Sequence, residues 1–166
     1  MPSTRKLKRV ASCSCGQVQL EAVGAPILTA SCHCDDCQKG SQQIEALPKA
    51  PPVRDPDGGS PYMIFRKDRV TCVSGTAMLK RYRLKEGSPT SRVVAGCCNS
   101  AMYLDFEKGH WLNVYRPRFG DNALPLQMHV QRKVTVGKTD VPSYPGYPLK
   151  FMTKLIGAKI AMLLHV

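Results

Sequence analysis

The sequence is poor in acidic and aromatic residues, and it lacks a long apolar run. Its 166 residues include 12 Asp and Glu against 24 Lys and Arg, which gives a formal charge of +12 at pH 7. No stretch approaches the roughly 18 apolar residues that a membrane-spanning helix needs, so we expect no transmembrane segment. The basic N-terminus, residues 1–9, has no apolar core of the kind found in secretory signals. A cytoplasmic protein is therefore predicted.

The excess of positive charge favours acidic partners such as nucleic acid, anionic lipid or a small polyanion. Residues 1–9 are interpreted as a solvated basic arm. Aromatic residues are few, at 7%, and no recognition helix is evident, which argues against nucleic-acid binding as the main function. A basic surface that binds nucleic acid or another partner stays an alternative, and binding that weakens steeply with salt would test it.

The eight cysteines are the strongest feature that is present. Disulfides are typical of short secreted chains, whereas clustered cysteines in a reducing compartment more often bind metal. Cys32, Cys34 and Cys37, here called the cysteine cluster, have the spacing C-x-C-x-x-C, at which a tight turn can present its sulfurs to one zinc ion. Three protein ligands with a fourth position open are the usual arrangement of a catalytic zinc site. The cluster is therefore the predicted catalytic centre.

The thiols outside the cluster form an early pair, a late pair and one single residue: Cys13 and Cys15, Cys97 and Cys98, and Cys72. One division puts both pairs on a closed structural zinc and leaves the cluster as an open site. The competing division puts the early pair with Cys34 and Cys37 on a single closed zinc, which leaves the late pair without a role. Cys72 lies in a Val-Thr-Cys-Val strand and is predicted to be a buried thiol that behaves as a small hydrophobe.

The order of these motifs resembles that of the glutathione-dependent formaldehyde-activating enzyme family, which includes the centromere protein V type. The resemblance covers about residues 9–116 and rests on three segments: Cys13-Ser-Cys-Gly16, Cys32-His-Cys-Asp-Asp-Cys37, and Arg92 followed by Cys98-Asn-Ser100. It implies a mainly β fold of several small coiled antiparallel sheets around zinc, of the Mss4-like type. It also implies a structural zinc on the two pairs and a labile zinc on the cluster.

The activity that this resemblance implies is carbon–sulfur lyase chemistry on a glutathione adduct of formaldehyde or of a related aldehyde. Two zinc ions are then the expected cofactors, and glutathione or a similar small thiol is the expected substrate. The rival interpretation is a non-catalytic zinc module. Soft thiolate ligands favour a further sulfur over water, so a substrate thiol suits the open position of the cluster.

The late motif departs from the family pattern at one ligand. Aligning Cys98-Asn99-Ser100 with the family's C-G-[ST] puts Ala95 where the first late cysteine belongs. Either Cys97 substitutes from a neighbouring position, or the structural zinc has lost a ligand. Asn99 in place of glycine is the milder change, because asparagine tolerates a left-handed turn better than most residues.

Polar residues beside the cluster are further candidates. His33 is predicted to point away from the metal and to support the fold or the site. Lys39 is the nearest cation and a candidate for binding a substrate carboxylate, while Asp35 and Asp36 are predicted to be solvated turn residues. No motif surrounds the remaining histidines, which are predicted to have no special role: His110, His129 and His165.

Three parts are predicted along the chain: the arm, a zinc-binding domain over residues 10–137, and a Pro/Tyr-rich segment with a C-terminal helix over residues 138–166. Residues 48–61 are too rich in Pro and Gly for regular structure and are predicted to form a surface loop. Alternating or β-branched runs predict the following strands: 17–23, 27–31, 62–65, 70–73, 77–83, 91–95, 101–106, 112–115 and 127–130.

Two helical segments are predicted, a short turn over residues 38–46 and an amphipathic helix at the C-terminus. In the second, apolar residues recur at helical spacing from Leu149 to Leu164, while lysines fall largely off that stripe. We expect this helix to dock on the body of the protein, with a membrane-surface or partner-binding helix as the alternative. The sequence does not indicate an oligomeric state.

Overall fold

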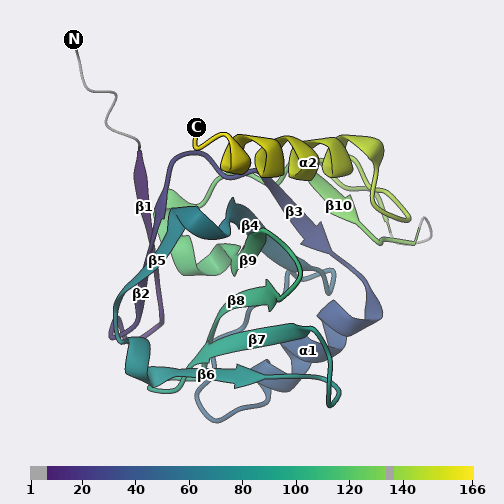
Figure 1. Ribbon diagram of the computed structural model, residues 1–166. Helices are drawn as coiled ribbons and strands as arrows, with labels where there is room; N and C mark the ends of the chain where they lie inside the picture. Colours follow the sequence, from purple (N-terminus) through teal and green to yellow (C-terminus); the bar gives the residue numbers. More distant parts are fainter. Residues whose placement is uncertain (1–6, 134–136) are drawn as a thin grey trace.

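The computed structural model describes residues 7–133 and 137–166 (Figure 1). Most of the predicted basic arm lies outside the described residues, and its last two residues already belong to a strand. The elements, in chain order, are β1 (Lys8–Ser12), β2 (Gln19–Val23), β3 (Leu28–Cys32), α1 (Asp35–Glu45), β4 (Ser60–Arg66), η1 (Lys67–Arg69), β5 (Val70–Ser74), η2 (Thr76–Met78), β6 (Leu79–Tyr82), β7 (Thr90–Ala95), β8 (Ser100–Phe106), β9 (Trp111–Tyr115), η3 (Arg116–Asn122), β10 (Met128–Val130) and α2 (Leu149–Leu163).

Two sheets contain these strands. The smaller has the order β1-β2-β5, and the larger has the order β10-β3-β4-β9-β8-β7-β6. The pairs are antiparallel except for β10 beside β3, which run parallel. In Figure 1 the small sheet stands at the left, α2 runs across the top and α1 lies at the lower right. This confirms the predicted mainly β fold with a C-terminal helix.

Strand β4 lies between two hydrophobic cores, and its residues are almost all buried. Tyr62 and Ile64 belong to the core that also contains residues of α1 and α2. Met63 and Phe65 belong to the core that the large sheet shares with the small one. Successive side chains of a strand point to opposite faces, so one central strand supplies both cores.

Helix α1 is longer than the predicted turn and begins directly in the cysteine motif. Cys34 is its N-cap, with extended backbone, and the sulfur of Cys34 accepts a hydrogen bond from the backbone N–H of Cys37. Asp35 and Asp36 occupy the first turn, where acidic side chains interact favourably with the helix dipole. The cap fixes the cysteine cluster at the positive end of the helix.

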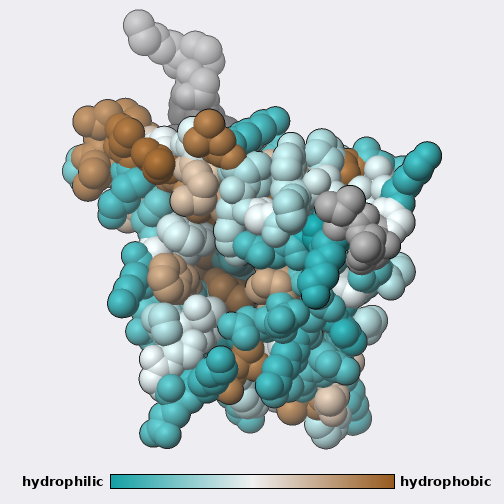
Figure 2. All heavy atoms as spheres, turned by 90° about the vertical axis from the view of Figure 1, so that its right-hand side faces the viewer, coloured by the Kyte–Doolittle hydropathy of each residue, from teal (hydrophilic) through white to brown (hydrophobic). Residues whose placement is uncertain are grey.

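Helix α2 docks as predicted, through one narrow side. Phe151 and Leu155 are buried against the body of the protein, whereas Met152, Ile156 and Ile160 are exposed. Figure 2 shows apolar side chains gathered at the top of the molecule, the level at which α2 lies in Figure 1. Within the described residues, no helix has the length and apolar character needed to cross a membrane.

Candidate metal centres and their cavity

The early and late cysteine pairs come together although 82 or more residues separate them in sequence. Cys13 and Cys15 follow β1, and Cys97 and Cys98 form the turn between β7 and β8. The four sulfur atoms all lie within 4.8 Å of one another. Sulfur–sulfur distances of 3.3 Å for Cys15–Cys97 and 3.8 Å for Cys13–Cys97 are far longer than the roughly 2.05 Å of a disulfide. Four sulfurs on a tetrahedral zinc lie about 3.8 Å apart, so this donor set fits zinc.

The sulfur that lies with those of Cys13, Cys15 and Cys98 is that of Cys97. Ala95 ends β7 with its side chain fully buried in the second core. Asn99 has a φ of 54°, the left-handed conformation expected where the family pattern has glycine. The turn is held by a hydrogen bond from the backbone N–H of Ser14 to the Ser100 hydroxyl, at 2.9 Å. A shifted cysteine can therefore occupy the place of the one that the motif lacks.

Hydrogen bonding also prepares one sulfur of this group for metal binding. Burial raises the pKa of the Cys98 thiol, but hydrogen bonds with Ser100 and Ser14 outweigh it and lower that pKa to about 5. A thiolate, the form that binds zinc, is thus favoured at Cys98 at neutral pH. Cys72 stands outside both groups; it is half-buried, and its sulfur donates to the carbonyl of Ser74.

The cysteine cluster lies at the junction of β3 and α1. Cys32 ends β3, Cys34 caps α1 and Cys37 is in its first turn, with the three sulfurs within 4.8 Å of one another. The Tyr62 hydroxyl donates to the sulfur of Cys37 across 3.7 Å. The sulfurs of the early pair lie with those of the late pair, and not with those of Cys34 and Cys37. The structure therefore agrees with the division of the thiols into a four-cysteine group and the three-residue cysteine cluster.

Charge within the cluster favours a cation. Hydrogen bonds from Cys32 and Cys37 lower the pKa of Cys34, and the hydrogen bond to Cys34 raises the pKa of Cys32 to about 11. Without a cation, only one of the three adjacent thiols readily carries a negative charge. A soft divalent ion would allow all three to bind as thiolates, so the donor set fits zinc.

A cavity of about 400 Å³ opens beside the cluster and is lined by all three of its cysteines. Most of its wall is apolar and comes from the large sheet, α2 and the segment before α2: Ala30, Ile64, Leu104, Phe106, Trp111, Val130, Tyr147, Phe151, Met152 and Leu155. The polar lining includes Arg92, Lys85 and Asn113. Enclosed apolar walls with a few polar groups are typical of small-molecule sites.

Arg92 is the most unusual group in this wall because it is a cation that is only 4% exposed. One of its terminal nitrogens donates to the backbone carbonyl of Asp36 at 2.5 Å. Its Nε atom has no hydrogen-bond partner, and in the described part of the chain Arg92 forms no ion pair. Asn113 Oδ1, also buried, has no partner among those residues. Buried polar atoms of this kind are normally paired, so both could form a hydrogen bond with water or with a polar ligand.

Helix α1 makes room for Arg92 with a glycine. A Cβ atom on Gly40 would lie 1.9 Å from Arg92 Nε, whereas a Cβ on Gly157 of α2 would meet nothing within 4 Å. We expect Gly40→Ala to lower the free energy of unfolding by about 1–3 kcal/mol through overpacking. Gly157→Ala is expected to raise it by up to about 1 kcal/mol through helix propensity. Thermal denaturation of both variants would measure this, and shifts of the same sign would contradict the close packing at Gly40.

Of the other candidates near the cluster, Lys39 and Asp35 lie outside the cavity wall, whereas Asp36 lines the cavity. Lys39 is exposed on α1 and does not line the cavity, so the cations that face it are Arg92 and Lys85. Asp35 is exposed, as predicted for a turn residue. Arg92 belongs to the late motif of the family pattern, but nothing in the sequence near the cysteines indicated that it lines the cavity.

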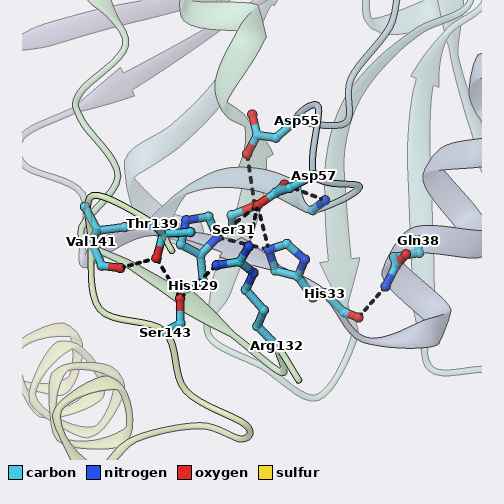
Figure 3. Close-up of polar contacts among 11 residues, drawn as sticks. Ser31, His33, Gln38, Asp55, Asp57, His129, Arg132, Thr139, Val141 and Ser143 are labelled. Carbon is cyan, nitrogen blue, oxygen red and sulfur yellow. Dashed lines mark hydrogen bonds and ion pairs between the residues drawn. The ribbon is translucent and has the colours of Figure 1, made fainter. Parts of the chain in front are cut away.

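His33 points away from the cysteine cluster, as predicted. Its Nε2 atom lies 2.9 Å from Nδ1 of His129, a residue for which no role was predicted (Figure 3). Burial lowers the pKa of both histidines. Of the other histidines, His110 contacts the carbonyl of Leu155 and His165 is exposed at the C-terminus. A contact between residues 96 apart in the chain left no local signal in the sequence.

The fold and the sulfur groups define a mainly β protein with cysteine clusters that could hold zinc. Residues 8–49 match the family model described as "Glutathione-dependent formaldehyde-activating enzyme". That segment contains the early pair and the whole cysteine cluster. The match supports the assignment of the chain to this family, in agreement with the resemblance of its motifs.

The chain has no match among curated proteins. The crystal structure of a Rhodobacter sphaeroides protein is similar to it with a TM-score of 0.48 and 13% sequence identity, over 81% of this chain and 98% of the other.

Proposed function

We propose that this chain is a zinc-dependent carbon–sulfur lyase that acts on the adduct of a small thiol and an aldehyde, with glutathione and formaldehyde as the pair that the family suggests. The observation that carries the proposal is the cysteine cluster at the wall of an apolar cavity that is also lined by Arg92, a buried cation that forms no ion pair within the described residues. A cytoplasmic, reducing compartment is part of the proposal, because thiolates bind zinc only while they stay reduced.

Each part of the cavity has a task in this reaction. Cys32, Cys34 and Cys37 would hold the zinc ion, which when bound would lower the pKa of a neighbouring substrate thiol and favour its thiolate form. In one direction the thiol loses its proton, the sulfur forms a bond to the carbonyl carbon as the carbonyl π bond breaks, and the carbonyl oxygen takes up one proton. In the other direction the hydroxyl loses its proton, the C=O bond re-forms, the carbon–sulfur bond breaks and the thiolate is reprotonated. The apolar wall would limit the access of water to the reacting atoms, which would strengthen electrostatic interactions there.

Arg92 would bind a carboxylate of the thiol substrate. A planar guanidinium recognises a carboxylate through paired hydrogen bonds, and Nε is one of the donors that such pairing uses. Burial strengthens the interaction because the local dielectric constant is low. Lys85, at the exposed part of the wall, would add positive charge at the entrance.

The activity itself is tested by following the formation of the glutathione–formaldehyde adduct by NMR. We expect the protein to accelerate it, a chelator to remove the acceleration, and added zinc to restore it. No acceleration by the zinc-loaded protein would instead favour a non-catalytic zinc module. Metal analysis is expected to find one zinc ion that exchanges readily and one that is held tightly.

Arg92→Gln is expected to raise KM for a thiol that bears carboxylates by about 10- to 100-fold, the equivalent of losing one charge-assisted hydrogen bond. Lys39→Gln is the matched control, and it should leave KM unchanged because Lys39 lies outside the cavity wall. The measurement compares glutathione with glutathione whose carboxylates are esterified. An equal loss for both thiols would contradict carboxylate binding by Arg92.

A further inference from the structure

A second group of side chains that could hold a metal ion lies on the other side of the strand that carries Cys32. It consists of His33, His129 and Asp57, here called the histidine group (Figure 3). Side chains of an extended segment alternate between its two faces, so Ser31 and His33 point one way and Cys32 the other. The histidine group is therefore separate from the cysteine cluster, and the proposed function does not use it.

Three segments that are distant in sequence build this group. Strand β10 runs parallel to β3 with His129 opposite Ser31, which places the two imidazole rings side by side. The predicted surface loop between α1 and β4 folds over them and contributes Asp57. A Cβ on Gly59 would lie 2.3 Å from the Ser31 hydroxyl and 2.6 Å from His33 Nε2, so only glycine lets the loop approach this closely.

The loop is anchored by further hydrogen bonds. The Ser31 hydroxyl donates to Asp55 at 3.0 Å, and Asp57 Oδ1 accepts from the backbone N–H of Gly59 at 3.1 Å. The backbone N–H of Asp55 also donates to the carbonyl of Gly59 at 2.8 Å. These contacts fix the carboxylate of Asp57 in front of the two rings.

The spacing of the three donor atoms fits a metal ion. Nε2 of His33 and Nδ1 of His129 are 2.9 Å apart, and Oδ2 of Asp57 is 3.7 Å from the first and 3.9 Å from the second. An ion at the centre of the circle through these atoms would lie about 2.1 Å from each, the usual length of zinc–imidazole and zinc–carboxylate bonds.

The environment of the histidine group is largely buried and contains two carboxylates, those of Asp55 and Asp57. His33 and His129 are 8% and 6% exposed, while the Asp57 side chain, at 26%, forms the rim. Within the described residues, Asp57 Oδ2 has no direct hydrogen bond; its nearest ionisable neighbours are these two rings and Arg132, at 3.7 Å. The carboxylates of Asp55 and Asp57 offset the positive charges of Arg132 and Arg116.

We propose that His33, His129 and Asp57 form a further metal site, which binds a divalent first-row transition ion such as Zn²⁺ or Co²⁺ between β3, β10 and the loop that carries Asp57. Two imidazoles and one carboxylate suit such ions better than Ca²⁺ or Mg²⁺, which prefer oxygen ligands alone. Remaining coordination positions would face a cavity of about 380 Å³ lined by residues that include Gln38, Gln131 and Arg132.

Cobalt titration of the metal-free full chain tests this site independently of the cysteines. Cobalt(II) bound by thiolates absorbs strongly in the near ultraviolet, whereas cobalt bound by imidazole and carboxylate does not. We expect the His129→Asn protein to bind one equivalent of cobalt fewer than the wild type, while its near-ultraviolet absorption stays unchanged. His165→Asn, which changes an exposed histidine outside the group, should keep the wild-type stoichiometry.

Asp57→Asn, a change at the rim, provides a second variant in case His129→Asn does not fold. It should lower the affinity for the same cobalt ion by at least about 10-fold, because loss of one of three protein ligands costs more than loss of a residue that only hydrogen-bonds to a ligand. Equal stoichiometry and affinity in the wild type and in a folded His129→Asn or Asp57→Asn protein would overturn the proposal. Absent near-ultraviolet absorption would count against the cysteine sites alone.

Discussion

Replacing Cys34 by serine is expected to abolish turnover and to release the readily exchanged metal ion while the protein stays folded. Serine is among the best N-cap residues, so the start of α1 should survive the change. The soft ligand is lost, however, and with it the thiolate that hydrogen bonds favour in the cluster. Because loss of even an outer metal partner costs 10- to 100-fold, we expect turnover to fall by at least about 100-fold.

Zinc analysis, the adduct assay and thermal denaturation together measure this outcome. Asp35→Asn is the control, since Asp35 is the exposed next residue and does not line the cavity. It should retain both zinc and turnover. Unfolding of the Cys34→Ser protein, or full activity without the exchangeable zinc, would contradict the placement of the catalytic centre at the cysteine cluster.

The sequence predicted those features that depend on neighbouring residues. Cys32, Cys34 and Cys37 fall within six consecutive positions, so their spacing alone places them close together. The alternation of polar and apolar residues predicted most strands, and helical spacing predicted α2. Helix α1 was predicted too short because the cap that starts it is a cysteine, which is not among the usual N-cap residues.

Features that depend on the packing of distant segments could not be predicted in the same way. The contact between His33 and His129 needs the parallel pairing of β10 with β3, and the three-residue strand β10 carries no register signal of its own. The same holds for Arg92, whose position in the cavity follows from the close approach of Gly40. The pairing of the early and late cysteines was one of two divisions that the sequence left open, and the resemblance to the family favoured it.

The second large effect is expected at the four-cysteine group. Cys97 is exposed, so a change to serine removes little packing, and a large loss of stability must come from the metal. Structural zinc contributes about 10–16 kcal/mol in zinc-finger peptides, and metal loss is among the few causes of very large destabilisation. We expect Cys97→Ser to lower the free energy of unfolding by more than about 3 kcal/mol.

For a chain of this size each kcal/mol corresponds to about 2–4 °C in Tm, so the fall should exceed roughly 6 °C. Cys72→Ser is the matched control, because it removes a half-buried thiol that belongs to neither sulfur group. It should shift Tm by much less and leave the tightly held zinc in place. If Cys97→Ser is no less stable than Cys72→Ser and keeps that zinc, then the early pair and Cys98 bind the ion without Cys97. In that case Cys97 does not replace the cysteine ligand that the family pattern has at the position of Ala95.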